Sequence, residues 1–186
     1  VDRVTRGTVL IASPTLRDPN FDHTVVLICE HGRGGSWGVV LNRRTPLTSR
    51  DVLQDLPFPV GVALPVHWGG PVETSQLQML HSLRREVPEA IEVAAGLRVG
   101  IPLDSMREVL SHDLLPGEQL RMFLGHAGWG EGQLEAELEM NSWSPCSGDI
   151  GILLDGDDAR MWDRILNALG PRYARLVTMP ANPRVN

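Results

Sequence analysis

The chain has 186 residues, of which 42% are hydrophobic and 22% charged, a composition typical of a globular protein. No apolar run approaches the roughly 20 residues of a membrane-spanning helix, so no membrane contact is expected. The net charge is −6, and all 17 basic residues are Arg. The absence of Lys excludes P-loop nucleotidases, Schiff-base enzymes and protein kinases, each of which needs a lysine amine.

Short β-rich runs dominate the first half of the chain. Strands are predicted at Thr8–Ala12, Thr24–Glu30, Trp37–Asn42, Val66–Trp68 and Gln76–Leu83. The second is continuously apolar, which fits a strand covered on both faces. The Gly-rich turn His31–Ser36 should join it to the third strand as a hairpin. A Thr-x-x-Asp start predicts a short helix at Thr48–Leu56.

Helices and strands alternate in the second half. Helices are predicted at Leu103–His112, Gly130–Asn141 and Asp157–Leu169, and strands at Gln119–Gly125 and Asp149–Leu154. The last helix has the clearest apolar face, and Gly170-Pro171 ends it. Early hairpins followed by interspersed helices predict an α+β fold with a mixed α/β arrangement.

The length predicts one compact domain, residues 1–179, with a flexible C-terminal tail at 180–186. Cys29 and Cys146 are the only cysteines, and no zinc-binding spacing accompanies them. Cys29 lies within an apolar run and is expected to be a buried small hydrophobic residue. Two lone thiols without a visible signal peptide predict a cytoplasmic location.

The segment Gly125–Gly132 is the strongest candidate for a ligand site. It leaves a predicted strand and enters a predicted helix, so its glycines could turn backbone N–H groups toward an anion near a helix N-terminus. Candidate ligand-binding residues are Gly125, His126, Gly128, Trp129 and Gly130, with Trp129 as a stacking platform. Glu131 opposes an anion there, and a self-capped turn with a packed Trp is the competing interpretation.

Catalytic and metal sites have weaker support. Ser13, Asp18 and His23 are the residue types of a nucleophilic triad, and Cys29 with His31 those of a thiol pair, but neither set lies in a known signature. We therefore assign no catalytic residue. The six histidines show no metal-ligand spacing, so no metal and no cofactor is expected.

Several segments carry a family resemblance through their order and spacing. They are Ser13–Val26, Cys29-Glu30-His31, Gly38–Arg43, Gly69-Gly70-Pro71-Val72, Leu80-His81, Gly125–Leu138 and Asn141-Ser142-Trp143. Together they resemble the YqgE/AlgH family of bacterial proteins over about residues 7–170. The resemblance implies a compact α/β fold with a mixed, branched sheet that includes a small barrel and is surrounded by helices.

The resemblance implies less about function. The AlgH name is associated with transcriptional regulation of alginate production, and the family offers no catalytic residues to carry over. We expect a non-enzymatic binding or regulatory protein with a protein or small-molecule partner. Because this chain is acidic and lacks a helix-turn-helix signature, any effect on transcription is expected to be indirect. Two alternatives stay open: an anionic-ligand or nucleotide site at Gly125–Gly132, in either a binding protein or an enzyme, and direct DNA binding through Arg43, Arg44 and Arg50.

Overall fold

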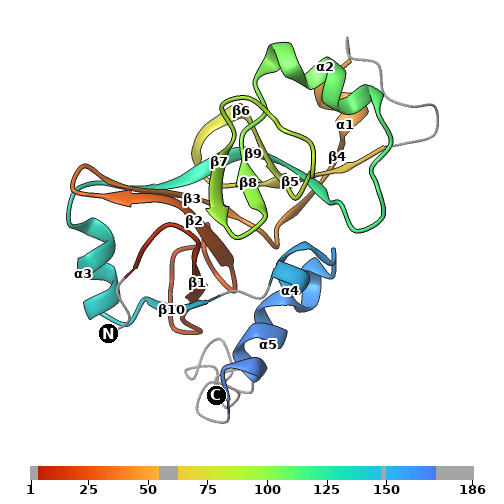
Figure 1. The fold of residues 1–186 in the computed structure, drawn as a ribbon. Helices are drawn as coiled ribbons and strands as arrows, with labels where there is room; N and C mark the ends of the chain where they lie inside the picture. Colours follow the sequence, from red (N-terminus) through yellow and green to blue (C-terminus); the bar gives the residue numbers. More distant parts are fainter. Residues whose placement is uncertain (1–3, 55–62, 148–149, 171–186) are drawn as a thin grey trace.

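The computed structural model describes residues 4–54, 63–147 and 150–170, so the predicted tail at 180–186 lies outside the described residues (Figure 1). The strands are β1 Thr8–Ala12, β2 Val25–Gly32, β3 Gly35–Val40, β4 Arg44–Thr48, β5 Pro65–Trp68, β6 Val72–His81, β7 Ile91–Ala94, β8 Leu97–Val99, β9 Leu120–Trp129 and β10 Trp143–Ser147. The helices are α1 Ser49–Val52, α2 Leu103–Ser111, α3 Gln133–Glu139, α4 Ile150–Leu154 and α5 Asp158–Ala168. None of the helices in this described part is long and apolar enough to cross a membrane.

The strands form one branched, mixed sheet in the order β10-β1-β2-β3-β9-β6-β8-β7. Strand β9 is the branch point, because β6 pairs along one edge while β5 and β3 share the other. The β5–β9 pair is parallel, and the other described pairs are antiparallel. The sheet curls into a half-barrel in which β7 approaches β2 (Figure 1). The predicted mixed, branched fold with surrounding helices is therefore confirmed.

Helices cover both faces of the β1–β2–β3 region. Side chains of α4 and α5, among them Met161, Trp162 and Ile165, pack with Leu27 and Val39 on one face. On the other face, α3 contributes Leu134 to a cluster containing Trp129 and Trp143. A third cluster joins α2, through Met106 and Val109, to β5, β6 and β9. This two-sided burial accounts for the unbroken apolar run of β2.

Most predicted elements are present, and one has the wrong type. The hairpin of β2 and β3 and the helices at α2, α3 and α5 are confirmed. Residues 150–154 were expected to form a strand but form α4, whose Leu153 and Leu154 are buried beside α5. A five-residue apolar run fits a buried helix turn as well as a strand, so periodicity could not separate them. The helix predicted at Thr48–Leu56 is the shorter α1, and Leu56 lies outside the described residues.

Candidate functional site

The candidate binding surface is an arm made by the end of the β2–β3 hairpin and the end of β9. We define the arm as residues 30–37 and 126–130. It extends to the left in Figure 1, with α3 below it. Ser36, Trp37 and Gly38 of β3 pair with Trp129, Gly128 and Ala127 of β9, so these chain segments are held in fixed register.

The predicted ligand segment has a different conformation from the one expected. Residues 125–129 continue β9 as a strand, so the prediction of a turn leaving the strand at Gly125 was wrong. Gly125 has φ +73°, and a Cβ there would lie 2.4 Å from the carbonyl oxygen of Gly70. This glycine therefore permits the close backbone approach at the branch of the sheet. The Gly130 N–H donates to Oε1 of Gln133 at 3.0 Å, so it is already engaged.

Trp129 lies in the core of the protein, on the face of the sheet that α3 covers. It is 6% exposed, and its indole N–H donates to Oε2 of Glu137 at 2.9 Å. Its ring lies 6.3 Å from that of Phe21 and 5.8 Å from that of Trp143. The indole is thus packed and hydrogen-bonded, and it is not placed as the exposed stacking platform that we expected.

The opposite face of the arm carries a different aromatic residue, Trp37. It is partly exposed and pairs across the sheet with Glu30 on one side and with Gly128 on the other. Its indole N–H donates to Oε2 of Glu30 at 3.3 Å. Gly128 is exposed and brings no side chain to the position paired with Trp37, so the nearest side chains there are those of Val72 and His126. Trp37 and Glu30 were missed as site residues, although alternation along Gly35–Val40 could have placed Trp37, and Glu30 is the first charged residue after the apolar run of β2.

A pocket of about 320 Å³ opens at the tip of the arm. Its lining consists of the hairpin and the end of β9: Glu30, Gly32, Gly34, Gly35, Ser36, Trp37 and Trp129. Gly35 has φ +122°, and a Cβ there would lie 2.3 Å from the carbonyl oxygen of Trp129. A glycine is therefore required for the hairpin to lie this close to β9.

His126 and Glu73 extend this face of the arm. The His126 ring lies 5.9 Å from that of Trp37 in an edge-on arrangement, and its Nδ1 is 3.8 Å from Oε2 of Glu73. Glu73 has φ +48°, a left-handed conformation that is uncommon outside glycine. The structure thus brings together His126 and Gly128 from the predicted set, and it adds Trp37, Glu30 and Glu73.

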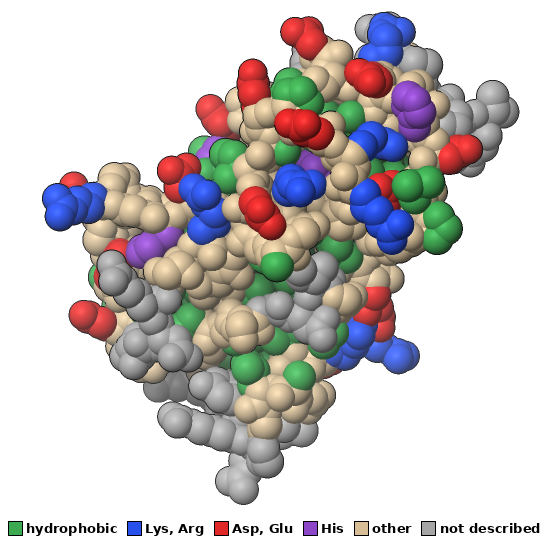
Figure 2. Space-filling view, viewed as in Figure 1, with side chains coloured by type: hydrophobic (Ala, Val, Ile, Leu, Met, Phe, Trp, Pro, Cys, Tyr) green, Lys and Arg blue, Asp and Glu red, His purple; other side chains and the backbone are tan. Residues whose placement is uncertain are grey.

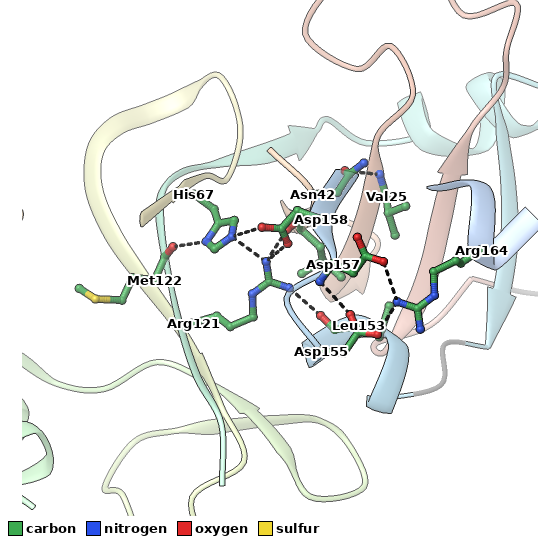
Figure 3. Close-up of polar contacts among 11 residues, drawn as sticks. Val25, Asn42, His67, Arg121, Met122, Leu153, Asp155, Asp157, Asp158 and Arg164 are labelled. Atoms are coloured by element: carbon green, nitrogen blue, oxygen red, sulfur yellow. Dashed lines mark hydrogen bonds and ion pairs between the residues drawn. The ribbon is translucent and has the colours of Figure 1, made fainter. Parts of the chain in front are cut away.

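A second polar group lies inside the protein, between β5, β9 and α5 (Figure 3). Nε2 of His67 lies 2.8 Å from Oδ2 of Asp158, and Nδ1 lies 3.3 Å from the carbonyl oxygen of Met122. Arg121 donates to Oδ1 of Asp158 at 2.5 Å and to the carbonyl oxygens of Leu41 and Leu153. We call His67, Arg121 and Asp158 the buried clasp, because they join the sheet to the C-terminal helices.

The electrostatics of the buried clasp favour the ionised pair. Burial raises the pKa of Asp158, but the hydrogen bond from His67 and the charge of Arg121 outweigh it and leave that pKa below its ordinary value. The His67 and Arg121 side chains are only 2% and 6% exposed. A His–Asp pair could orient a catalytic base, but here both ring nitrogens already have protein partners. The arrangement therefore serves to hold α5 against the sheet.

The other candidate residues are separated or engaged. Ser13 contacts Thr15, Asp18 accepts the N–H of Asn20, and His23 pairs with Asp22, so the triad considered from the sequence is not assembled. Cys29 and Cys146 are free thiols, both buried. Burial raises the pKa of Cys29 to about 12 and that of Cys146 to about 11, which opposes a thiol nucleophile.

The three arginines considered for DNA contact have different environments. Arg43 donates to the carbonyl oxygens of Pro19 and Asp22 and lies over the ring of Trp68. Arg44 and Arg50 are exposed. On the face of the molecule drawn in Figure 2, acidic and basic side chains are interspersed over the upper half, so no single-sign basic patch is seen in that view.

Comparison with known proteins agrees with this mixed, branched fold. The AlgH-like family model matches residues 9–174, and the chain belongs to that family. A UPF0301 protein of Bacteroides thetaiotaomicron is 32% identical over 97% of this chain and 91% of its own length. A UPF0301 protein of Hahella chejuensis is 36% identical over 92% of each chain.

Two solved structures share the fold. The solution structure of the AlgH protein from Pseudomonas aeruginosa matches with a TM-score of 0.75 and 28% identity, over 97% of this chain and 98% of that one. A crystal structure of a protein from Corynebacterium diphtheriae matches with a TM-score of 0.79 and 22% identity, over 96% and 94%. At that lower identity the likeness concerns the fold alone.

Proposed function

We propose that this chain is a non-enzymatic binding protein with a regulatory role, and that the arm is its binding surface. The observation that carries the proposal is the partly exposed Trp37, held beside the bare Gly128 at the edge of an open pocket. Exposed aromatic residues in a rigid setting supply contact area with little loss of conformational entropy. The side chains of His67, Asp158 and Arg121 are of types that enzymes use, but here they bind one another and the backbone within the buried clasp.

The same geometry also weighs against the two alternatives. A site for an anionic ligand or nucleotide on this face of the arm would meet the carboxylates of Glu30 and Glu73, which repel anions. The net charge of −6 and the engaged Arg43 disfavour direct DNA binding. We propose that any effect on transcription passes through a bound partner, in a reducing cytoplasm that suits two free thiols.

The test is a ligand screen read at individual tryptophans. The protein is mixed with panels of amino acids, short peptides, nucleotides and sugar phosphates, and the five indole N–H signals are followed by NMR. Ligands are expected to shift the Trp37 signal while that of Trp162, which donates to the Ala12 carbonyl in the core, stays fixed.

Gly128 offers a blocking variant and a matched control. A Cβ at this exposed position meets only ordinary contacts, at 3.6 Å from Val72 and 3.9 Å from His126, so substitution should preserve the fold. Gly128→Leu is expected to abolish the shift and Gly128→Ala to retain it. Ligands that bind equally well to Gly128→Leu, or that leave the Trp37 signal unmoved, would overturn the proposal.

A further inference from the structure

We infer that the arm takes a cationic group, namely the guanidinium of an arginine side chain presented by a peptide segment of a partner protein. This inference rests on the proposed function of the arm. Three observations support it: the position of two carboxylates around Trp37, the strained backbone at one of them, and the chemistry of the indole itself.

The carboxylates lie on both sides of the aromatic residue. Glu30 accepts the Trp37 indole N–H with Oε2, which leaves Oε1 able to accept a second donor. Glu73 lies beyond His126, and its side chain is 57% exposed. Arg33, which is exposed, is the only Arg or Lys within the described hairpin turn, so the two carboxylates outnumber the permanently charged cation. The charge around the indole is therefore complementary to a cation.

Glu73 adopts a backbone conformation that a different residue would adopt more easily. At φ +48° a glycine would avoid the steric cost that a Cβ brings. Strained residues of this kind concentrate at functional sites, where the side chain has a use. Here the strained backbone holds a carboxylate 3.8 Å from the His126 ring and on the same side of the sheet as Trp37.

A guanidinium fits this arrangement better than an ammonium. Its planar face stacks on an indole, and its fork of N–H donors can reach a carboxylate at the same time. An ammonium is a compact and more strongly hydrated charge that cannot do both in one plane. The partner segment should therefore present Arg.

The test uses the peptide acetyl-Gly-Arg-Gly-amide and its neutral citrulline counterpart, titrated while the Trp37 indole signal is recorded. The Arg peptide is expected to bind about 2- to 5-fold more tightly than the citrulline peptide, with the difference decreasing at high salt. Glu30→Gln should weaken Arg-peptide binding by a similar factor, and the exposed Glu131→Gln should leave it unchanged. Glu73→Gly should also weaken binding while leaving the protein at least as stable.

Equal binding of the two peptides, stronger binding of acetyl-Gly-Glu-Gly-amide, or no shift of Trp37 by the Arg peptide would overturn this inference. In the first two cases ligands still shift Trp37, so the proposed function stands. Binding that moves other signals but never Trp37 would overturn both. Self-association lost in both Arg33→Ala and Trp37→Ala would identify a second copy as the occupant and overturn the assignment to a partner protein.

Discussion

The buried clasp gives the sharpest stability prediction. Asp158→Asn keeps the size of the side chain but removes the negative charge that faces Arg121 at 2.5 Å. Arg121 is 6% exposed and Asp158 11% exposed, so the orphaned cation stays within the protein. Removing one partner of a buried ion pair costs about 3–5 kcal/mol. Because Asp158 retains some contact with water, we expect about 3 kcal/mol, equivalent to a fall in Tm of roughly 6–12 °C for a chain of this length.

Urea unfolding followed by tryptophan fluorescence measures this loss, since Trp162 lies on α5 beside the clasp. Asp163→Asn on the same helix is the control, and we expect it to change the free energy of unfolding by less than about 0.5 kcal/mol. The folded-state pKa of Asp158 is lowered, so its stabilisation is present above the ordinary carboxyl pKa and is lost as the pH falls through the folded value. A loss below about 1 kcal/mol at pH 7 in Asp158→Asn would refute the clasp as a stabilising contact.

Three further predictions concern single residues. Burial raises the pKa of Cys29 to about 12, which lowers the fraction of reactive thiolate. A thiol reagent at pH 8 should therefore modify Cys29 roughly a thousandfold more slowly in the folded protein than in the urea-unfolded protein. Equal rates in the two states would contradict the burial of Cys29. Burial lowers the pKa of His81, so the free energy of unfolding should fall as the pH drops from 7 to 5, by at most about 1.4 kcal/mol per pH unit. His81→Leu should make this dependence on pH less steep. An unchanged pH dependence in urea titrations of His81→Leu would refute the role of His81. Gly35→Ala should lower Tm because its Cβ would meet the Trp129 carbonyl, whereas Gly34→Ala, with nothing within 4 Å, should not; equal melting curves would contradict the close approach.

Local sequence patterns could predict the elements whose environment is simple. The helix α5 has an apolar face over Met161, Trp162 and Ile165, and all three are buried. The β2 run is apolar throughout because helices pack on both faces of its sheet, and this was predicted from the run alone. In both segments the pattern of apolar residues follows directly from which faces are buried: one face of α5 and both faces of β2.

The end of β9 could not be predicted in the same way. A cluster of glycines between periodic segments favours a turn, and four glycines within residues 125–132 therefore predict that this strand ends at Gly125. In the fold it permits contact with the Gly70 backbone, and β9 continues to pair with β3. The need for that glycine comes from a segment more than fifty positions earlier in the chain.

The candidate site was only partly predicted, because several of its residues also come from segments distant in the sequence. His126 and Gly128 were named from their own motif, but Trp37, Glu30 and Glu73 reach them only through strand pairing across the sheet. Trp129 has the same residue type as Trp37 and points to the opposite face, where it is packed against Phe21 and Trp143. A shift of one residue along a strand thus separates a core residue from a surface residue.

The central claim is that the arm binds a partner, and crosslinking in living cells tests it most directly. A photoreactive amino acid replaces Arg33 at the tip of the arm or, as a control, the exposed Leu115 in the loop before β9. We predict one defined adduct from position 33 that disappears when Gly128→Leu is added and persists with Gly128→Ala. An adduct at position 33 that survives Gly128→Leu, or a defined adduct from position 115 with none from position 33, would contradict the claim.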